Sequence, residues 1–226
     1  MNPENFKLEL GGHLWYYADL VKNPDSLLEH LTKDVKWVTE TYNMFGKAVP
    51  TPRLLSSMFD PDIITRDEAG VLHLTKKLKT GKVWRETSSW FQAGGPWTPL
   101  IQEFKQDLET FLTEEHGREI KFPYAQLNYY KSGDNYIGYH TDSEVAEDGL
   151  IASISLGASR RFVLRDKDKD AGQPNYEFFL EHGSLLVMDC GSGKTYYKHS
   201  LPKIRKKDGY VDEKGMGRVN ITFRMG

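Results

Sequence analysis

The pattern of apolar and polar positions divides the chain into an N-terminal part with helices and a C-terminal part rich in strands. Apolar side chains recur at helical spacing between Pro96 and Glu115, which predicts a helix that ends at Gly117. A second helix is expected over Ser26–Thr32, after the start signal Asn23-Pro24-Asp25. Glycine and prolines between residues 44 and 60 indicate a hairpin or loop in that segment.

After Lys121, short stretches rich in aromatic and β-branched residues alternate with turn-forming residues. This spacing is typical of a β-sandwich or jelly roll. The predicted strands are Tyr124–Tyr130, Ile151–Leu156, Arg161–Leu164, Tyr176–Leu180, Ser184–Met188, Tyr196–His199 and Arg218–Arg224. We therefore expect an α+β fold in which helices pack on the outside of a C-terminal sandwich.

Length and charge narrow the class of protein. The 226 residues suffice for one large domain with its own core. The net charge of -2 excludes a uniformly basic nucleic-acid binder, but two local basic clusters remain. A solvated surface explains either cluster taken alone. The clusters are Lys76, Lys77, Lys79, Lys82 and Arg85, and Lys203, Arg205, Lys206 and Lys207.

Several features bear on the cellular environment. The single cysteine, Cys190, excludes an internal disulfide and a Cys-rich zinc site. No apolar run is long enough to cross a bilayer, and the first residues lack the pattern of a signal peptide. We therefore expect an intracellular protein that does not bind membranes. The sequence leaves the oligomeric state open, and a monomer is the default expectation. We expect the nucleus rather than the cytoplasm, although a basic loop explains Lys203–Lys207 as well as an import signal does.

One motif is rejected. Gly191-Ser192-Gly193-Lys194-Thr195 resembles the end of a phosphate-binding P-loop. The full pattern requires a glycine five residues before Gly193, and Met188 occupies that position. The run also lies in a β-rich region rather than at a turn from a strand to a helix. We therefore reject an ATPase function.

The last predicted strand has the most informative pattern. Its four polar residues share one face because side chains alternate along a strand. An ordinary half-exposed strand would have this pattern. However, two guanidiniums with an amide and a hydroxyl between them also suit a small dicarboxylate, since arginine binds carboxylates in a bidentate manner. The polar residues are Arg218, Asn220, Thr222 and Arg224, and the apolar ones are Val219, Ile221 and Phe223.

A candidate metal site lies upstream. His140-Thr141-Asp142 places an imidazole and a carboxylate on the same face of an extended segment. His199, shortly before the arginine strand, is the favoured third ligand, while the Gly-Ser after His182 indicates a turn role for that competitor. Two histidines and one carboxylate form the facial triad of non-haem Fe(II) oxygenases. The same ligands can hold Zn(II) or Mn(II), and it is the dicarboxylate clamp that favours iron with 2-oxoglutarate.

With these motifs, the chain resembles the AlkB-type Fe(II)/2-oxoglutarate dioxygenases, above all their eukaryotic DNA-dealkylating members. The arginine strand is highly specific for this family, whereas the His-x-Asp pair alone is not. The matching stretches keep the family order and cover residues 121–226. They are Leu127–Tyr130, Ile137–Glu144, Ile151–Ala158, His182–Leu186, His199–Pro202 and Arg218–Arg224.

The resemblance implies a double-stranded β-helix (jelly-roll) core over residues 121–226. Residues 1–120 would add helices, a hairpin and a nucleotide-recognition lid to the same structural unit. Fe(II) would be held by His140, Asp142 and His199. The co-substrate 2-oxoglutarate would be held by Arg218 and Arg224, with Asn128, Tyr130 and Asn220 assisting. Glu144 would act as a catalytic helper beside the metal and face the substrate base, although a solvated loop acid is the alternative.

The N-terminal half matches the family less well. Met44-Phe45-Gly46-Lys47 followed by Pro52-Arg53 resembles the hairpin with which duplex-acting members push an aromatic residue into the base stack. Phe45 would then be the wedge and Arg53 a backbone or base contact. A hydrophobic side chain tucked under its own loop explains Phe45 equally well.

The segment from Asp60 to Gly95 departs from the family because it is longer and rich in lysine, although Pro96-Trp97 is kept. Trp84, Trp90 and Phe91 are candidates to stack on a methylated base. Core packing is expected for at least one of them.

The resemblance implies oxidative demethylation of N-alkylated bases in DNA, of the 1-methyladenine and 3-methylcytosine type. The reaction would couple 2-oxoglutarate and O₂ to succinate, CO₂ and formaldehyde. An RNA demethylase, or a hydroxylase of proteins or small molecules on the same core, is the alternative. A nucleic-acid-binding module without catalysis is disfavoured because every metal and co-substrate position is filled.

Overall fold

The computed structural model describes residues 7–10, 13–44, 46–76, 78, 86–142, 145–166, 176–190, 195–204, 212–213 and 215–225. Within these residues the fold is rich in strands and contains few helices. The helices are α1 (Pro24–Asp34), α2 (Ser89–Gln92) and α3 (Pro99–His116), with a 3-10 turn, η1, at Pro61–Ile63. None of these helices has the length and apolar character that a bilayer crossing requires.

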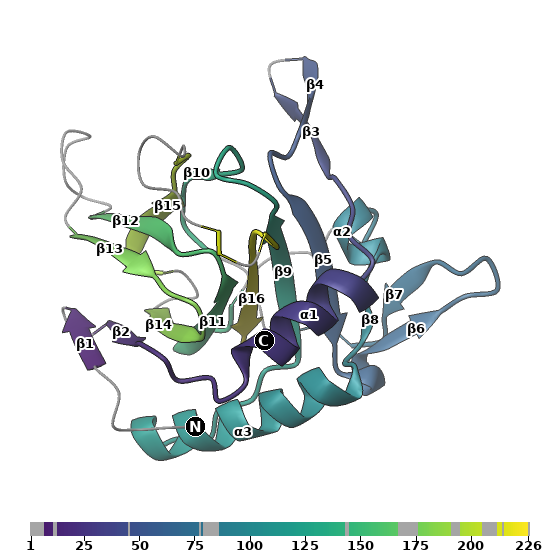
Figure 1. Cartoon of the computed structure of the whole chain (residues 1–226). Helices are drawn as coiled ribbons and strands as arrows, with labels where there is room; N and C mark the ends of the chain where they lie inside the picture. The colour runs from purple at the N-terminus through teal and green to yellow at the C-terminus, as the bar shows by residue number, and fades with distance from the viewer. Residues whose placement is uncertain are drawn as a thin grey trace.

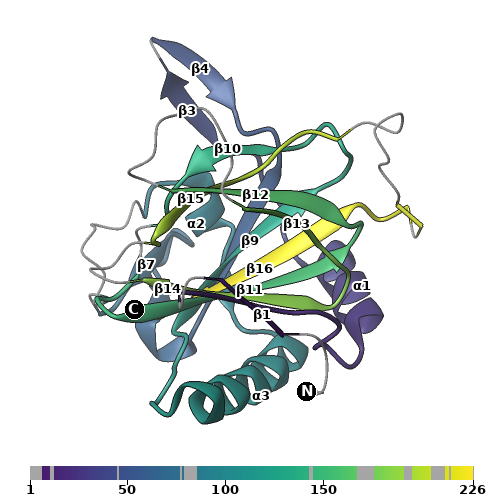
Figure 2. The same cartoon turned by 90° about the vertical axis from the view of Figure 1, so that its left-hand side faces the viewer.

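Two sheets form the body of the molecule, and in Figure 2 the small sheet lies above the main sheet. The main sheet has the spatial order β1 (Lys7–Leu10), β2 (Leu14–Tyr17), β14 (Ser184–Cys190), β11 (Gly149–Gly157), β16 (Arg218–Arg224), β9 (Tyr124–Tyr130), β5 (Leu54–Phe59) and β8 (Gly95–Pro96). The small sheet has the order β10 (Ile137–His140), β15 (Tyr197–Leu201), β12 (Arg160–Asp166) and β13 (Tyr176–Leu180).

Two hairpins extend from this body (Figure 1). The first pairs β3 (Thr41–Met44) with β4 (Lys47–Pro50), and the second pairs β6 (Ile64–Arg66) with β7 (Leu72–Leu74). The side chains of β4 are exposed along the whole strand. The first hairpin therefore extends away from the main core, as a projecting contact element would.

The strand pattern predicted from the sequence is largely confirmed. β9, β13 and β16 have the predicted bounds, and β11, β12 and β14 include the predicted segments and run longer. The predicted helix 96–115 is observed as α3, which begins three residues later because Gly95 and Pro96 pair with β5. Gly117 ends α3 with a left-handed φ of 63°, a conformation that glycine adopts without a steric penalty.

Two expectations need correction. Part of the segment 44–60, expected to be a hairpin or loop, forms β5, a largely buried strand between β9 and β8. The sandwich is also not built from the C-terminal part alone, since β1, β2, β5 and β8 of the N-terminal part belong to the main sheet. A short strand buried on both faces lacks the alternation that identifies strands in a sequence.

The main sheet separates a hydrophobic core from a polar cavity. Alternate residues of β16 (Val219, Ile221 and Phe223) pack with α1 and α3, which cover this face of the sheet. The other residues of β16 are polar yet buried, with Arg218 at 2% and Arg224 at 4% exposure. Burying charged groups is costly unless they find partners. The polar face of β16 therefore belongs to an internal site rather than to a solvated surface.

Candidate metal centre and co-substrate cavity

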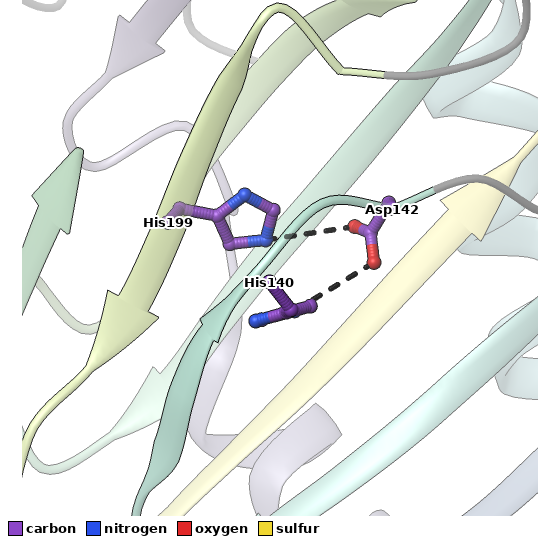
Figure 3. Close-up of side chains that lie close together, drawn as sticks. All are labelled: His140, Asp142 and His199. Carbon is purple, nitrogen blue, oxygen red and sulfur yellow. Dashed lines mark ion pairs between the residues drawn. The ribbon is translucent and has the colours of Figure 1, made fainter. Parts of the chain in front are cut away.

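Three predicted metal ligands come together at one end of the small sheet. β10 and β15 are antiparallel, and His140 and His199 are directly paired in their register. Asp142 follows two residues after His140, and each histidine Nε2 lies 3.7 Å from one of its carboxylate oxygens (Figure 3). The ligand atoms lie within 4.8 Å of one another. This geometry suits a single metal ion.

The protonation states of these side chains favour the binding of a cation. Burial would raise the pKa of Asp142, but the Arg224 guanidinium and the two imidazoles outweigh it and hold this pKa well below its ordinary value. Burial lowers the pKa of His199 to about 4, against the opposing effect of Asp142, so this imidazole is neutral at neutral pH. His140 Nδ1 lies 2.9 Å from the Gly138 carbonyl oxygen. A proton donated there leaves the Nε2 lone pair facing Asp142.

The polar face of β16 lines the same cavity, which has a volume of about 680 Å³. Arg224 donates from Nη2 to Asp142 Oδ1 at 3.1 Å and from Nη1 to Gln126 Oε1 at 3.2 Å. Thr222 donates to Asn220 Oδ1 at 2.8 Å, and Asn128 donates to the same oxygen at 3.3 Å. One group of hydrogen bonds thus connects the candidate metal ligand Asp142 to Arg224, and a second group joins the polar side chains of Asn128, Asn220 and Thr222.

Arg218 has an incomplete set of partners. It donates from Nη2 to Ser155 Oγ at 2.9 Å, and its guanidinium lies 5.3 Å from the centre of the Tyr130 ring. Burial lowers its pKa to about 10, so it remains charged at neutral pH. Its Nε is buried and has no hydrogen-bond partner within the described part of the chain. A carboxylate would supply the missing acceptor, so the residues present fit a dicarboxylate co-substrate.

Residues of the first hairpin and of the segment around α2 also line the cavity. The lining includes Thr41, Tyr42 and Asn43 of β3, and Trp90 of α2. Arg53, in the segment between β4 and β5, donates from Nε to Asn128 Oδ1 at 2.7 Å. Asn128 lies on β9 beside β16. The base of the hairpin is therefore hydrogen-bonded to the polar network of the sheet.

The aromatic residues that were candidates for stacking on a base have different surroundings in the structure. Phe91 is fully buried and packs on Phe59 with 5.0 Å between ring centroids, so it is a core residue. Trp90 is half-buried and lines the cavity. Phe45, Trp84 and Glu144 lie outside the described residues.

The other sequence candidates lie apart from the cavity. His182 accepts from the Gly157 N–H at 2.9 Å and lies 2.8 Å from Asp25 Oδ1, as expected for a turn histidine. Lys76 forms an exposed ion pair with Asp62 at 2.8 Å, and Lys203 lies 5.0 Å from the Tyr136 ring. The rest of both basic clusters and residues 191–194 of the P-loop-like run lie outside the described residues.

Among the acidic and basic residues that line the cavity, Glu40 was not predicted from the sequence. Glu40 is 8% exposed and lines the cavity, although it belongs to no motif. A single glutamate ahead of a hairpin carries no signal in the sequence. Only the folding of the segment before β3 against α2 brings its carboxylate to this wall.

Comparison with known proteins agrees with this geometry. The family model described as "2OG-Fe(II) oxygenase superfamily" matches residues 21–224. "DNA oxidative demethylase ALKBH2" of Bos taurus is 31% identical over 210 residues, which cover 88% of this chain and 63% of that protein. The human protein of the same name is 30% identical, with 88% and 67% covered. "Alpha-ketoglutarate-dependent dioxygenase alkB homolog 3" of Mus musculus is 26% identical over 216 residues, with 92% and 63% covered.

Solved structures share the fold at low identity. "The structure of OsALKBH1" superposes with a TM-score of 0.58 at 16% identity and covers 98% of this chain and all (100%) of that one. An oxidoreductase of the 2OG-Fe(II) oxygenase family from Burkholderia pseudomallei superposes with a TM-score of 0.54 at 13% identity, with 94% and 85% covered. This chain spans somewhat less than two thirds of the bovine relative's length, at 63%. The family match over nearly the whole chain, together with these relatives, shows that the chain belongs to the 2OG-Fe(II) oxygenase superfamily as an AlkB-type member.

Proposed function

We propose that the chain is a nucleic-acid dealkylase that removes N-linked methyl groups from DNA bases of the 1-methyladenine and 3-methylcytosine type. One observation carries the proposal. A single cavity is lined by the His140–Asp142–His199 cluster, by the buried polar face of the arginine strand, and by residues of the projecting hairpin together with Trp90. The names of the ALKBH2 and alkB homolog 3 relatives support the same class of reaction.

The cluster His140, Asp142 and His199 would hold Fe(II), and Arg218 would bind a carboxylate of 2-oxoglutarate through its incompletely bonded guanidinium. When bound, iron and 2-oxoglutarate supply, with O₂, the oxidation of the N-methyl carbon, which leaves as formaldehyde, with succinate and CO₂ as co-products. Arg224 keeps the Asp142 carboxylate oriented through its 3.1 Å hydrogen bond. Asn128, Tyr130 and Asn220 complete the polar surface around the co-substrate.

The hairpin and the segment around α2 would act as the nucleotide-recognition lid. Phe45, the next residue in the sequence after β3, would be the wedge that fills the space left by an extruded base. Arg53 would hold the hairpin base against Asn128 and contact the nucleic acid. Trp84 and Glu144 would complete the substrate contacts, with Glu144 beside the metal.

The test is turnover of a single-stranded DNA oligonucleotide that carries one 1-methyladenine, with Fe(II), 2-oxoglutarate and ascorbate present. The mass of the base is the readout. We expect loss of the methyl group with the wild-type protein and with His182→Ala, whose histidine lies outside the cavity, and no loss with His199→Ala. Consumption of 2-oxoglutarate without demethylation would reject the proposed substrate. RNA and protein substrates would then be tested on the same core.

A further inference from the structure

Glu40 is a buried carboxylate in the wall of the cavity, and it has unused acceptor capacity. Its Oε2 accepts from the Trp90 backbone N–H at 3.2 Å, and its Oε1 accepts a long bond from the Thr41 N–H at 3.4 Å. An ionised carboxylate offers about four acceptor positions. Among the residues that the structure describes, two of these positions therefore have no donor, and Glu40 is only 8% exposed.

No cation pairs with Glu40 among the ion pairs of the described residues. Burying a carboxylate without a cation is costly, and two backbone donors offset only part of that cost. The main chain of Glu40 is fixed by two hydrogen bonds with Thr51, at 2.7 Å and 3.2 Å. The carboxylate is therefore held at the cavity wall without a counter-charge from the described residues, and a positively charged ligand would supply one.

Trp90 lines the cavity next to this carboxylate. Its backbone is bonded to Glu40, and its half-buried side chain packs beside Phe91, with the ring centroids 6.2 Å apart. The face of an indole attracts cations and stacks on planar bases. An anion and an aromatic side chain on the same wall form a combination suited to a flat, cationic ring.

We propose that Glu40 and Trp90 form a subsite that selects alkylated bases in their cationic form. This inference rests on the proposed function and specifies its substrate class. Methylation at N1 of adenine or N3 of cytosine produces a positively charged base, whereas N3-methylated thymine is neutral. Glu40 would add a charge-assisted interaction with the first two that it does not make with the third. The subsite lies on the hairpin side of the cavity and adds an acid to those of the metal centre.

Binding without turnover is the direct test. The holoenzyme, loaded with Fe(II) and 2-oxoglutarate under nitrogen, is titrated with labelled five-nucleotide strands that contain 3-methylcytosine, 3-methylthymine or no lesion. We expect the wild-type protein to bind the 3-methylcytosine strand about tenfold more tightly than the 3-methylthymine strand. Glu40→Gln should remove most of this difference, because the amide can still accept from the Trp90 N–H but carries no charge. Glu103→Gln, at an exposed position of α3, should keep it.

A purely structural role for Glu40 makes a different prediction. In that case Glu40→Gln would weaken the binding of both methylated strands equally. Such an equal loss, or a preference for the 3-methylcytosine strand as large as in the wild type, would overturn the proposal. A thermal melt of each variant shows whether the fold is intact, and Trp90→Phe, which keeps an aromatic ring, provides a second variant if Glu40→Gln does not fold. That variant should reduce the preference, and an unaltered preference would overturn the role of Trp90.

Turnover of the same strands in air separates this inference from the proposed function. If the wild-type protein binds the cationic strand more tightly but demethylates neither strand, the proposed demethylase function is rejected and the proposed subsite is supported. If the protein demethylates both strands but binds them equally well, the proposed function is supported and the proposed subsite is rejected.

Discussion

The imidazoles of His140 and His199 lie next to each other on the paired strands β10 and β15, with 4.3 Å between their ring centroids. The two residues are far apart in the chain, and only the register of these strands places them together. A shift of one residue in this register would turn one imidazole to the opposite face of the sheet. The carboxylate of Asp142, just beyond the end of β10, completes the group.

This group predicts that metal binding depends on Asp142. Asp142→Asn removes the negative charge that lies 3.7 Å from both imidazoles, so the affinity for Mn(II) or Fe(II) should fall by about 100-fold or more. Anaerobic titration calorimetry measures the change. Asp134→Asn, at an exposed turn residue, is the matched control and should bind the metal as the wild type does. Unaltered affinity in Asp142→Asn would place the metal elsewhere.

Arg218 should determine the affinity for 2-oxoglutarate. Arg218→Lys keeps a positive charge but loses the planar fork that binds a carboxylate in a bidentate manner. We expect the Kd of 2-oxoglutarate for the metal-loaded protein to rise about tenfold or more, with metal affinity unchanged. Calorimetry with each ligand in turn separates the two effects. Arg161→Lys, on the exposed part of β12, should leave both affinities unchanged.

The projecting hairpin predicts a difference between duplex and single-stranded substrates. Phe45→Ala removes the proposed aromatic wedge, and its loss should matter only where an extruded base leaves a gap in a stack. We expect kcat/KM on duplex DNA to fall about tenfold, while kcat/KM on a single strand stays within about twofold. Val49→Ala, an exposed residue of β4, serves as the control on the same hairpin. Equal losses on both substrates would show that Phe45 is needed for the hairpin itself.

A close approach of two backbones predicts a stability effect at Gly157. This residue has a φ of 87°, and a Cβ there would lie 2.2 Å from the Gly217 carbonyl oxygen. The Ala158 N–H donates to that same oxygen at 2.8 Å. Gly157→Ala should therefore lower the free energy of unfolding by about 2–3 kcal/mol, as measured by urea denaturation. At Gly95, where a Cβ meets nothing within 4 Å, the change to alanine should cost less than about 1 kcal/mol.

The sequence alone was sufficient to predict much of the core. Alternation along Arg218–Arg224 predicted a strand with one polar face, and helical spacing predicted α3. The His140–Asp142 pair and the arginine strand also pointed to the class of chemistry. These features are local, because strand and helix periodicity place neighbouring residues on one face whatever the rest of the fold.

Other features were decided only by the tertiary structure. The burial of β5 in the main sheet depends on its neighbours β8 and β9, and its own residues carry no alternation. The separation of Trp90, in the cavity wall, from Phe91, in the core, depends on how α2 packs against β5. The position of Glu40 depends on the contact between the hairpin and the segment at Trp90. Each of these depends on long-range contacts, which fix the surroundings of a side chain and leave no mark in the local order of residues.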